Sequence, residues 1–559
     1  MMKKIALILI LSLFAINSKA VIRQATTLTQ LFESLSKSVK GDSVYVPPTS
    51  IINATDTTIT IPGGVTLYSS RMPTPGSTGG ALIYSTSLTK VDIYTPLIQT
   101  GGEDVTISSI RLRGATNEIT DFDYRRGVSK GIHGLHKNLR ITNCEIFWFD
   151  MWGVYLYVPA GAIITNNYIH HCRNAGYGYG VWVGGAGVKY EGTAIISNNI
   201  FDACRSAVDA SGHYSNMIVT NNTFLPEQHY TVISRHGQSN GCIGGNQTIV
   251  TNNLVLSKSR SFTIPKSATD SGFISIKNNR LRSLPCAFNK QVSSIACDGD
   301  LICLGDTAYA SNIPFISKLQ TSIVASKDTI KVGETVTLTA TGGNRFWWKI
   351  GETTLPQIDR VGQTITYRFT RPGAYVITLY SFLNAGSNSV PAEPNITYKT
   401  IYVLPTEGTW VIAWVKDSYI GVIKDKFKKS ILINDSTYWS DDIEGYEGWQ
   451  RVMIRFDQPI KKISLDLRCI NDSPANEIGE LFCWFDGISI VSPTKVLFHD
   501  SFEADRIVWQ LANTNLGSNV STQNPVGEKR DGEKSWLFRK AIGGNSSAGW
   551  GGRLSWNFK

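Results

Sequence analysis

The sequence predicts an all-β chain in which a parallel β-helix is followed by two β-sandwiches. Three observations support this prediction. A repeat runs from Leu139 to Arg282, and short alternating strands separated by turn residues follow from about Ser317. The chain also holds 50 Gly and 14 Trp and has few long helical patterns, which favours strands over helices. A chain of 559 residues is also too long for one ordinary core, so several domains are expected.

The repeat consists of six similar lines. They read LRITNCEI from Leu139, AIITNNYI from Ala162, AIISNNIF from Ala194, MIVTNNTF from Met217, TIVTNNLV from Thr248 and FISIKNNRL from Phe273. Taking Asn143, Asn166, Asn198, Asn221, Asn252 and Asn278 as equivalent, the steps are 23, 32, 23, 31 and 26 residues. Such periods, with a short strand on each side of a polar turn, indicate the stacked rungs of a parallel β-helix.

The recurring asparagines have a structural interpretation. Asparagine tolerates a left-handed turn, and its side-chain amide can bond to the equivalent residue one rung above or below. A residue type that returns in every rung is better suited to a corner than to a single reaction centre. We therefore expect an asparagine ladder at one corner of the coil.

The rung pattern, together with VTLYSSRMPTPGSTGGALIYS at Val65 and DVTISSIRLRG at Asp104, resembles the right-handed parallel β-helix proteins of the pectin-lyase-like superfamily. The resemblance covers about residues 21–312. It implies a right-handed coil and a polysaccharide partner. That superfamily includes lyases, glycoside hydrolases, esterases, adhesins and viral tail spikes, so the resemblance constrains the substrate class more than the reaction.

The N-terminal segment has the layout of a secretory signal. Residues 1–20 contain Lys3 and Lys4, an apolar run and a small-residue exit ending at Ala20, and no later apolar segment is long enough to span a membrane. We expect a secreted or cell-surface protein. Residues 27–39 then carry apolar side chains at helical spacing, which predicts a short amphipathic helix capping the open end of the β-helix.

Residues 317–405 read as short alternating strands that predict a sandwich of about ninety residues. The stretches GETVTLTATG and RPGAYVITLYS resemble an immunoglobulin-like module of the polycystic-kidney-disease (PKD) type, although the stretch from Trp347 to Gly351 departs from the family's usual motif. Such modules are usually spacers. Trp347 and Trp348 are accordingly expected in the core.

Residues 406–559 resemble a carbohydrate-binding jelly roll whose halves occur in reversed order. The segment ELFCWFDGISIVSP looks like the last strand of that fold, and VLFHDSFEADRIVWQ looks like its beginning. The two pieces together have the length of one domain, which favours a circularly permuted jelly roll. Its many tryptophans include candidates for stacking on sugar rings.

The net charge constrains the class of binding partner only weakly. The formal charge is +10, and removing the three lysines of the signal leaves +7, which suits an acidic polysaccharide. Basic residues are scattered, unlike the stripe of a nucleic-acid binder.

Cys172 and Cys204 should stack as buried thiols in neighbouring rungs, whereas Cys469 and Cys483 are the better candidates for a disulfide.

The candidate site lies on the strand after each polar turn. Aligning these strands places Val154, Val181, Val208, Val232 and Thr263 in an inward column, so the intervening side chains should face outward. One outward column reads Tyr155, Trp182, Asp209, Ile233 and Ile264, and the next reads Tyr157, Gly184, Ser211, Arg235 and Lys266. The predicted catalytic residues are Asp209, Arg235, Lys266, His213 and His236, and the predicted sugar-binding residues are Tyr155, Tyr157, Trp182 and Tyr214.

Three functions remain open at this stage. A polysaccharide lyase would use Lys266 or Arg235 as the base, with Asp209 as an orienting group or a ligand to a possible Ca²⁺, as its resemblance to β-helix lyases implies. A glycoside hydrolase would need a second carboxylate beside Asp209. In a non-catalytic glycan-binding protein or adhesin, Asp209 and Arg235 would form only a surface ion pair.

Overall fold

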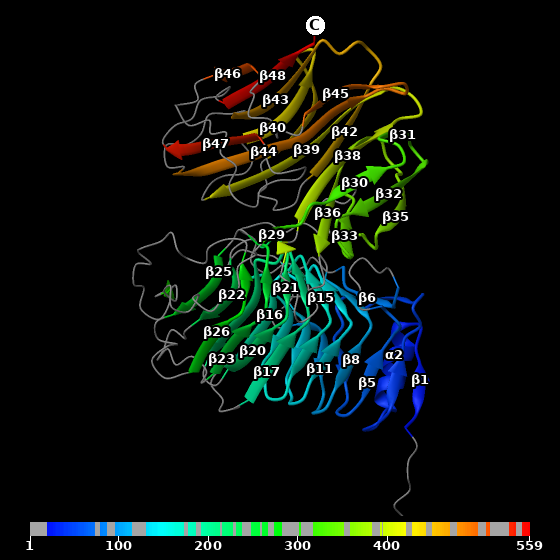
Figure 1. The fold of residues 1–559 in the computed structure, drawn as a ribbon, viewed down its shortest axis with the longest axis vertical. Helices are drawn as coiled ribbons and strands as arrows, with labels where there is room; N and C mark the ends of the chain where they lie inside the picture. The colour runs from blue at the N-terminus through cyan, green and yellow to red at the C-terminus, as the bar shows by residue number, and fades with distance from the viewer. Residues whose placement is uncertain are drawn as a thin grey trace, which may run out of the picture.

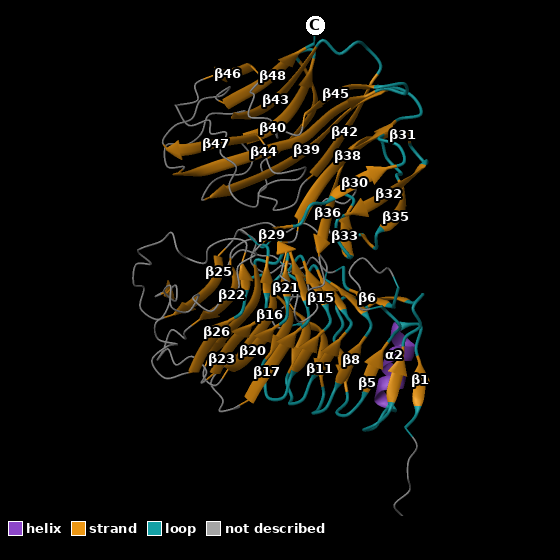
Figure 2. Cartoon of the chain, viewed as in Figure 1, coloured by secondary structure: helices purple, strands orange, loops and turns teal. Residues whose placement is uncertain are grey.

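The computed structural model describes residues 20–558, apart from several internal segments. These segments are 73–78, 87–94, 115–129, 173–176, 186–191, 213–214, 227, 229–230, 237–246, 258–259, 266–272, 282–300, 303–316, 352–357, 383–391, 394, 421–426, 443–449, 470–477, 501–509, 515–535 and 544–550. The predicted signal, up to residue 19, lies outside the described residues. Strands dominate throughout, and Figure 2 shows one helix beside the first rungs.

Three parallel sheets form a right-handed β-helix, which Figure 1 shows from its blue first rungs to its green last ones. Sheet A contains β1 (Ile22–Gln24), β2 (Ser43–Tyr45), β5 (Thr66–Tyr68), β8 (Thr106–Ser108), β11 (Arg140–Thr142), β14 (Ile163–Thr165), β17 (Gly192–Ser197), β20 (Ser215–Thr220), β23 (Gln247–Thr251) and β26 (Phe273–Lys277). Sheet B contains β3 (Ile51–Asn53), β6 (Leu82–Tyr84), β9 (Arg111–Arg113), β12 (Glu145–Phe147), β15 (Tyr168–His170), β18 (Ile200–Asp202), β21 (Thr223–Phe224), β24 (Leu254–Val255) and β27 (Arg280–Leu281). Sheet C contains β4 (Ile59–Ile61), β7 (Pro96–Thr100), β10 (Lys130–Gly134), β13 (Trp152–Leu156), β16 (Tyr179–Gly185), β19 (Ser206–Gly212), β22 (Thr231–His236) and β25 (Arg260–Pro265), with β28 (Leu301–Ile302) antiparallel to β25.

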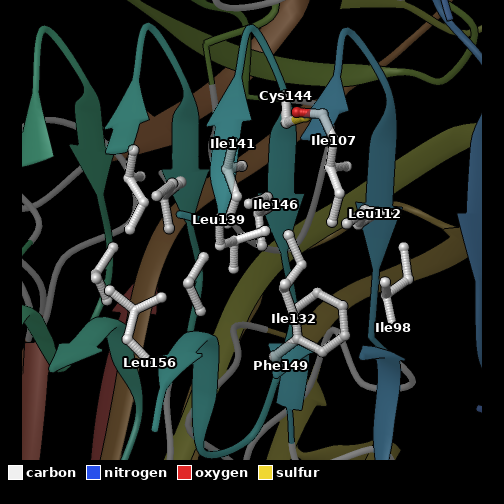
Figure 3. Close-up of a cluster of buried hydrophobic side chains, with 14 of the residues drawn as sticks. Ile98, Ile107, Leu112, Ile132, Leu139, Ile141, Cys144, Ile146, Phe149 and Leu156 are labelled. Atoms are coloured by element: carbon white, nitrogen blue, oxygen red, sulfur yellow. The ribbon is translucent and has the colours of Figure 1, made fainter. Parts of the chain in front are cut away.

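Inward side chains of the three sheets stack in columns along the coil axis. Ile107 pairs with Ile141 and then Ile164 in sheet A, and all three are fully buried. Figure 3 shows Ile107, Ile141 and other aliphatic side chains, together with Phe149, in the space between the sheets. Every strand therefore contributes to one continuous apolar core, which stabilises stacked rungs that could not fold singly.

Two adjacent asparagines have different structural roles at the corner between sheets A and B. The first, such as Asn166 or Asn198, adopts a left-handed conformation with φ of 58° or 57°. The second forms the ladder: Asn167 donates from its backbone N and from Nδ2 to Oδ1 of Asn199 at 3.0 and 2.9 Å, and Asn199 repeats this toward Asn222. The predicted asparagine corner is confirmed, with the buried member of each pair making the bonds.

The predicted N-terminal cap is also confirmed. Helix α2 (Leu28–Ser36) begins after Thr27, whose hydroxyl accepts a hydrogen bond from the backbone N of Gln30. Leu31 and Leu35 are buried against the first rung. Within the described ranges, no helix has the length and apolarity needed to cross a membrane.

A first sandwich follows the β-helix. One sheet contains β30 (Ser322–Ala325), β32 (Thr335–Thr341) and β35 (Thr364–Arg368). The other contains β31 (Thr329–Lys331), β38 (Asn395–Leu404), β36 (Gly373–Phe382), β33 (Arg345–Lys349) and β34 (Arg360–Val361), while β29 (Ser317–Lys318) pairs with β37 (Ala392–Glu393). Trp347 and Trp348 are buried, as the sequence predicts.

A second sandwich completes the chain. One sheet holds β42 (Gln450–Phe456), β39 (Thr409–Ile420), β44 (Ile478–Val491), β45 (Val496–Asp500) and β47 (Trp536–Gly543), and the other holds β41 (Ser436–Asp442), β40 (Phe427–Ile433), β43 (Lys462–Cys469), β48 (Gly551–Asn557) and β46 (Gln510–Thr514). Leu554 shares a core with Val411 and Leu465, so the early and late segments build one unit. Figure 1 shows the first sandwich between this unit and the β-helix.

One cysteine prediction is confirmed and one is wrong. Cys172 and Cys204 are buried free thiols, as their spacing in the repeat predicts. Cys483 is also a buried free thiol, and its strand β44 lies in the opposite sheet from β43, which carries Cys469. The two strands do not form the hairpin on which the predicted disulfide depended.

Candidate functional site

The outer face of sheet C presents one column of polar and aromatic residues. Strand pairing aligns His133 with Tyr155, Tyr155 with Trp182, Trp182 with Asp209, and Asp209 with Ser234. Three residues earlier, a second column aligns Lys130, Trp152, Tyr179 and Ser206. The rungs therefore bring residues from four separate lines of the sequence onto one surface.

Two consecutive residues face the core between these columns. In β19, Ala207 and Val208 are both fully buried members of the apolar core, and in β22 the corresponding Val232 and Ile233 are also buried. This inward pair interrupts strict alternation, while the strands stay in register from rung to rung. It explains why the outward columns lie three residues apart.

The strand pairing corrects the predicted register of β22 by one residue. Val208 pairs with Ile233 and not with Val232, so Ile233 faces the core and Ser234 takes the place next to Asp209. Arg235 pairs with the buried Ala210, and His236 pairs with Ser211, so the prediction that Arg235 shares the column of Ser211 was wrong and His236 takes that place. The prediction that Ile233 faces outward was wrong because simple alternation allows no pair of neighbouring inward residues.

The aromatic residues of the two columns pack on one another along the coil. The rings of Tyr155 and Trp182 are stacked, with centroids 4.4 Å apart and planes 9° apart, and both side chains are half-buried. Trp152 lies 4.9 Å from Tyr155 and 6.0 Å from Trp182. Gly184 makes room for this arrangement, because a Cβ there would lie 1.8 Å from Cη2 of Trp182.

A lysine and a histidine extend the aromatic surface on the N-terminal side. The ammonium group of Lys130 lies 4.6 Å from the ring centre of Tyr155, and the Lys130 residue is 1% exposed. The His133 ring lies 4.8 Å from that of Tyr155 and 6.3 Å from that of Tyr157. Burial and the neighbouring charge of Lys130 lower the pKa of His133 to about 3, so this imidazole is neutral at neutral pH.

Asp209 lies on the other side of the aromatic residues and is fully buried. Burial, followed by the negative charge of Asp209, raises the pKa of the Tyr179 hydroxyl, while the charge of Arg205 and its hydrogen bond to Tyr179 act in the opposite direction. Asp209, Tyr179 and Arg205 therefore form one electrostatic group. The prediction that Asp209 is an exposed group was wrong, although its place in the outward column holds.

The side chains of the remaining predicted site residues lie outside the described part of the structure. His213, Tyr214 and Lys266 lie outside the described residues, as do the side chains of Arg235 and His236. Of the predicted residues that are described, Tyr155, Trp182 and Asp209 share one column, and Tyr157 contacts the site through His133.

Sequence reasoning missed Lys130, His133, Tyr179 and Arg205. Lys130 and His133 lie in β10, one rung before the first line of the repeat, where the asparagine pair is absent. The available signal was the similarity of KGIHG in β10 to WGVYL in β13, which share a glycine at the second position. That similarity is short, and it becomes visible only after the rungs have been aligned.

The described residues provide few side chains that could bind a metal ion. Among the described residues, no group of three or more His, Cys, Asp and Glu side chains is placed to hold one. Strands β10, β13, β16 and β19 together contain one carboxylate, that of Asp209. A calcium role for Asp209 would therefore require oxygen ligands from elsewhere.

Comparisons with known proteins agree with the coil architecture. A family model described as "Right handed beta helix region" matches residues 108–284, and no curated protein matches the chain. The solved structures that resemble it include an alginate lyase from Paenibacillus sp. str. FPU-7, with 16% identity, 47% of this chain and 87% of that chain covered, and a TM-score of 0.36.

Two phage proteins are similar at lower identity. The tailspike protein gp49 from Acinetobacter baumannii bacteriophage Fri1, a capsular polysaccharide depolymerase, has 12% identity, covers 78% of this chain and 83% of its own, and gives a TM-score of 0.23. The Dettilon tailspike protein gp208 has 10% identity, covers 94% and 90%, and gives a TM-score of 0.22. At these identities and TM-scores, the similarity carries no information about the function of this chain.

Proposed function

We propose that the outer face of sheet C binds an acidic polysaccharide and that the protein cleaves it by β-elimination. The observation that carries this proposal is the column in which His133, Tyr155, Trp182 and Asp209 occupy successive rungs beside the cation of Lys130. Aromatic rings offer apolar contact area to sugar rings, and a cation close to them suits a sugar that carries a carboxylate.

The residues divide into roles that suit this reaction. A lyase removes the proton next to a uronate carboxylate, which becomes acidic enough only when a cation neutralises the carboxylate. Arg205, which is half-buried beside Tyr179, supplies the cation for the substrate carboxylate, while the buried Lys130 adds positive charge through space beside Tyr155. We assign the base to Lys266, since Arg235 pairs with the buried Ala210, and we assign Asp209 to orienting Tyr179 and Arg205 or to binding Ca²⁺.

A hydrolase fits this surface less well. Both stereochemical classes of glycosidase need two carboxyl groups flanking the bond that is cleaved. Asp209 is the one carboxylate within strands β10, β13, β16 and β19, and its side chain is buried. Because Asp209 is buried, the second candidate function is a non-catalytic surface that binds glycans.

The rest of the chain suits an exported glycan-acting protein. We assign residues 1–20 to a secretory signal, residues 317–405 to a PKD-like spacer and residues 406–559 to a carbohydrate-binding jelly roll. The two-sheet sandwich that joins β39–β45 to β46–β48 supports the last assignment, because both segments contribute to one core.

The proposed reaction leaves a characteristic product. β-Elimination creates a sugar with a carbon–carbon double bond beside the carboxylate, which absorbs ultraviolet light, whereas hydrolysis creates reducing ends without that absorbance. The purified protein should be incubated with a panel of acidic and neutral polysaccharides, with and without a calcium chelator. Ultraviolet-absorbing products from an acidic polymer are expected. Reducing ends alone would indicate a hydrolase, and neither signal would favour the binding protein.

A further inference from the structure

A cavity lies away from sheet C, between the asparagine corner of the β-helix and the first sandwich. Its volume is about 750 Å³. Asn166, Asn198 and Asn221 line it from three successive rungs, and Arg345 and Trp347 line it from β33 of the sandwich. Its walls thus come from two units that are far apart in the sequence.

A buried interface holds the two walls in place. Nζ of Lys349 in β33 lies 2.9 Å from Oδ2 of Asp202 in β18, and both side chains are almost fully buried. The hydroxyl of Tyr168 donates to that carboxylate and accepts a hydrogen bond from the backbone N of Ile358, each at 3.2 Å. Apolar side chains of both units, including Leu225 and Trp347, pack around these bonds. The cavity is therefore built into the docked structure.

The asparagine wall presents polar groups at a fixed spacing. Asn166, Asn198 and Asn221 are exposed, and their side-chain amides form no hydrogen bond with another described residue. Neighbouring rungs place equivalent residues about 4.8 Å apart. A row of amides, each able to donate and accept, can bind the hydroxyl groups of a sugar chain.

The sandwich wall presents a cation on an aromatic surface. The guanidinium of Arg345 lies 4.4 Å from the ring centre of Trp347 and 5.3 Å from that of Phe382. It forms no ion pair with a carboxylate among the described residues. A planar guanidinium held on an aromatic ring is well suited to bidentate binding of a carboxylate.

We propose that this cavity is a second saccharide site that binds a uronate unit, with Arg345 holding the carboxylate and the three asparagines holding hydroxyl groups. Among the described residues that line the cavity there is no Asp, Glu, His or Lys. We assign the cavity a binding role, because Arg345 is engaged in holding the carboxylate. This inference is independent of the reaction proposed for sheet C.

Two substitutions and one matched control test the cavity. Arg345→Gln removes the cation, and Asn198→Asp keeps a residue that tolerates the left-handed turn while placing a negative charge on the wall. Asn252→Asp makes the same change one rung beyond the cavity, where the exposed Asn252 has φ of 58°. Each variant is made in the full chain carrying Trp182→Ala, which weakens the proposed sheet C site, and its folding is checked by thermal melting.

Calorimetric titration should use an oligogalacturonate and an oligomannuronate, with a neutral xylo-oligosaccharide of equal length as the reference. We expect at least one oligouronate to bind, and Arg345→Gln and Asn198→Asp to weaken its binding at least about tenfold, since the first removes the charge-assisted contact and the second places a carboxylate close to the bound uronate. Asn252→Asp should leave the affinity unchanged. Equal weakening by Asn252→Asp, unchanged affinity in both cavity variants, equal affinity for the neutral sugar, or no binding of either oligouronate would overturn the proposal.

Discussion

Trp182 depends on the absence of a side chain at Gly184. A methyl group at Gly184 would meet the Trp182 ring at 1.8 Å, so Gly184→Ala must displace the ring from its stack on Tyr155. We expect the affinity for the glycan substrate to fall about tenfold, which corresponds to about 1.4 kcal/mol, while the melting temperature changes little because both residues lie on the outer face. Affinity electrophoresis in gels containing the polysaccharide measures this change.

A double-variant cycle provides the control for this prediction. In the Trp182→Ala background, Gly184→Ala should have no further effect, since the ring that it would displace is absent. An equal loss of affinity in both backgrounds would show that Gly184 acts through the backbone and not through Trp182.

At the residue scale, the sequence predicts a side chain's position along the coil better than its burial. Tyr155, Trp182 and Asp209 share the predicted column, but Asp209 is buried, and the register of β22 differs by one residue because Val232 and Ile233 both face the core. Alternation alone cannot reveal such an inward pair, because both of its residues are apolar.

At the element scale, the asparagine ladder should stabilise the coil strongly. The side chain of Asn199 accepts two hydrogen bonds from Asn167 and donates to Ile164 O and to Asn222 Oδ1, all in the buried corner. Asn199→Ala leaves several buried groups without partners, so we expect the free energy of unfolding to fall by about 3–5 kcal/mol. Urea denaturation of the full chain measures this loss.

The neighbouring asparagine offers a matched comparison. Asn198 has φ of 57° and an exposed side chain, and glycine adopts that conformation readily. Asn198→Gly should therefore change the free energy of unfolding by no more than about 0.5 kcal/mol. Similar losses for Asn198→Gly and Asn199→Ala would contradict the assignment of the ladder to the second asparagine.

The repeat and the cap could be predicted at this scale because each has a local signature. Helix α2 follows a helical spacing of apolar residues, and the rungs follow the asparagine pairs. Strand β10 lacks such a pair, so Lys130 and His133 were not connected with the site. The disulfide predicted for Cys469 and Cys483 failed because strands that are close in the sequence belong to different sheets.

At the scale of the whole molecule, one buried ion pair links the β-helix to the first sandwich. Lys349→Met would leave the carboxylate of Asp202 buried without its cation. We expect a loss of about 3–5 kcal/mol in the free energy of unfolding. Lys399→Met removes a cation from an exposed pair with Asp328 at 2.8 Å and should cost no more than about 1 kcal/mol.

Scanning calorimetry distinguishes a linking role from a merely local one. The loss of Lys349 should separate the melting of the β-helix from that of the sandwich, since their common interface is weakened. A single transition at the wild-type temperature in Lys349→Met would contradict this role. The sequence could not predict the link, because Asp202 and Lys349 are 147 residues apart and belong to units with separate repeat and strand patterns.

The central claim, that sheet C carries the reaction, is tested most directly by the turnover of Asp209→Asn. The assay follows ultraviolet-absorbing product from the acidic polysaccharide that the wild type degrades fastest, and Ser234→Ala, one rung away in the same column, is the control. Because we assign Asp209 to orienting Tyr179 and Arg205, we predict a fall in kcat of at least about 100-fold in a protein that remains folded, with Ser234→Ala close to the wild type. Full turnover in folded Asp209→Asn, or a wild type that degrades no acidic polysaccharide, would contradict the claim.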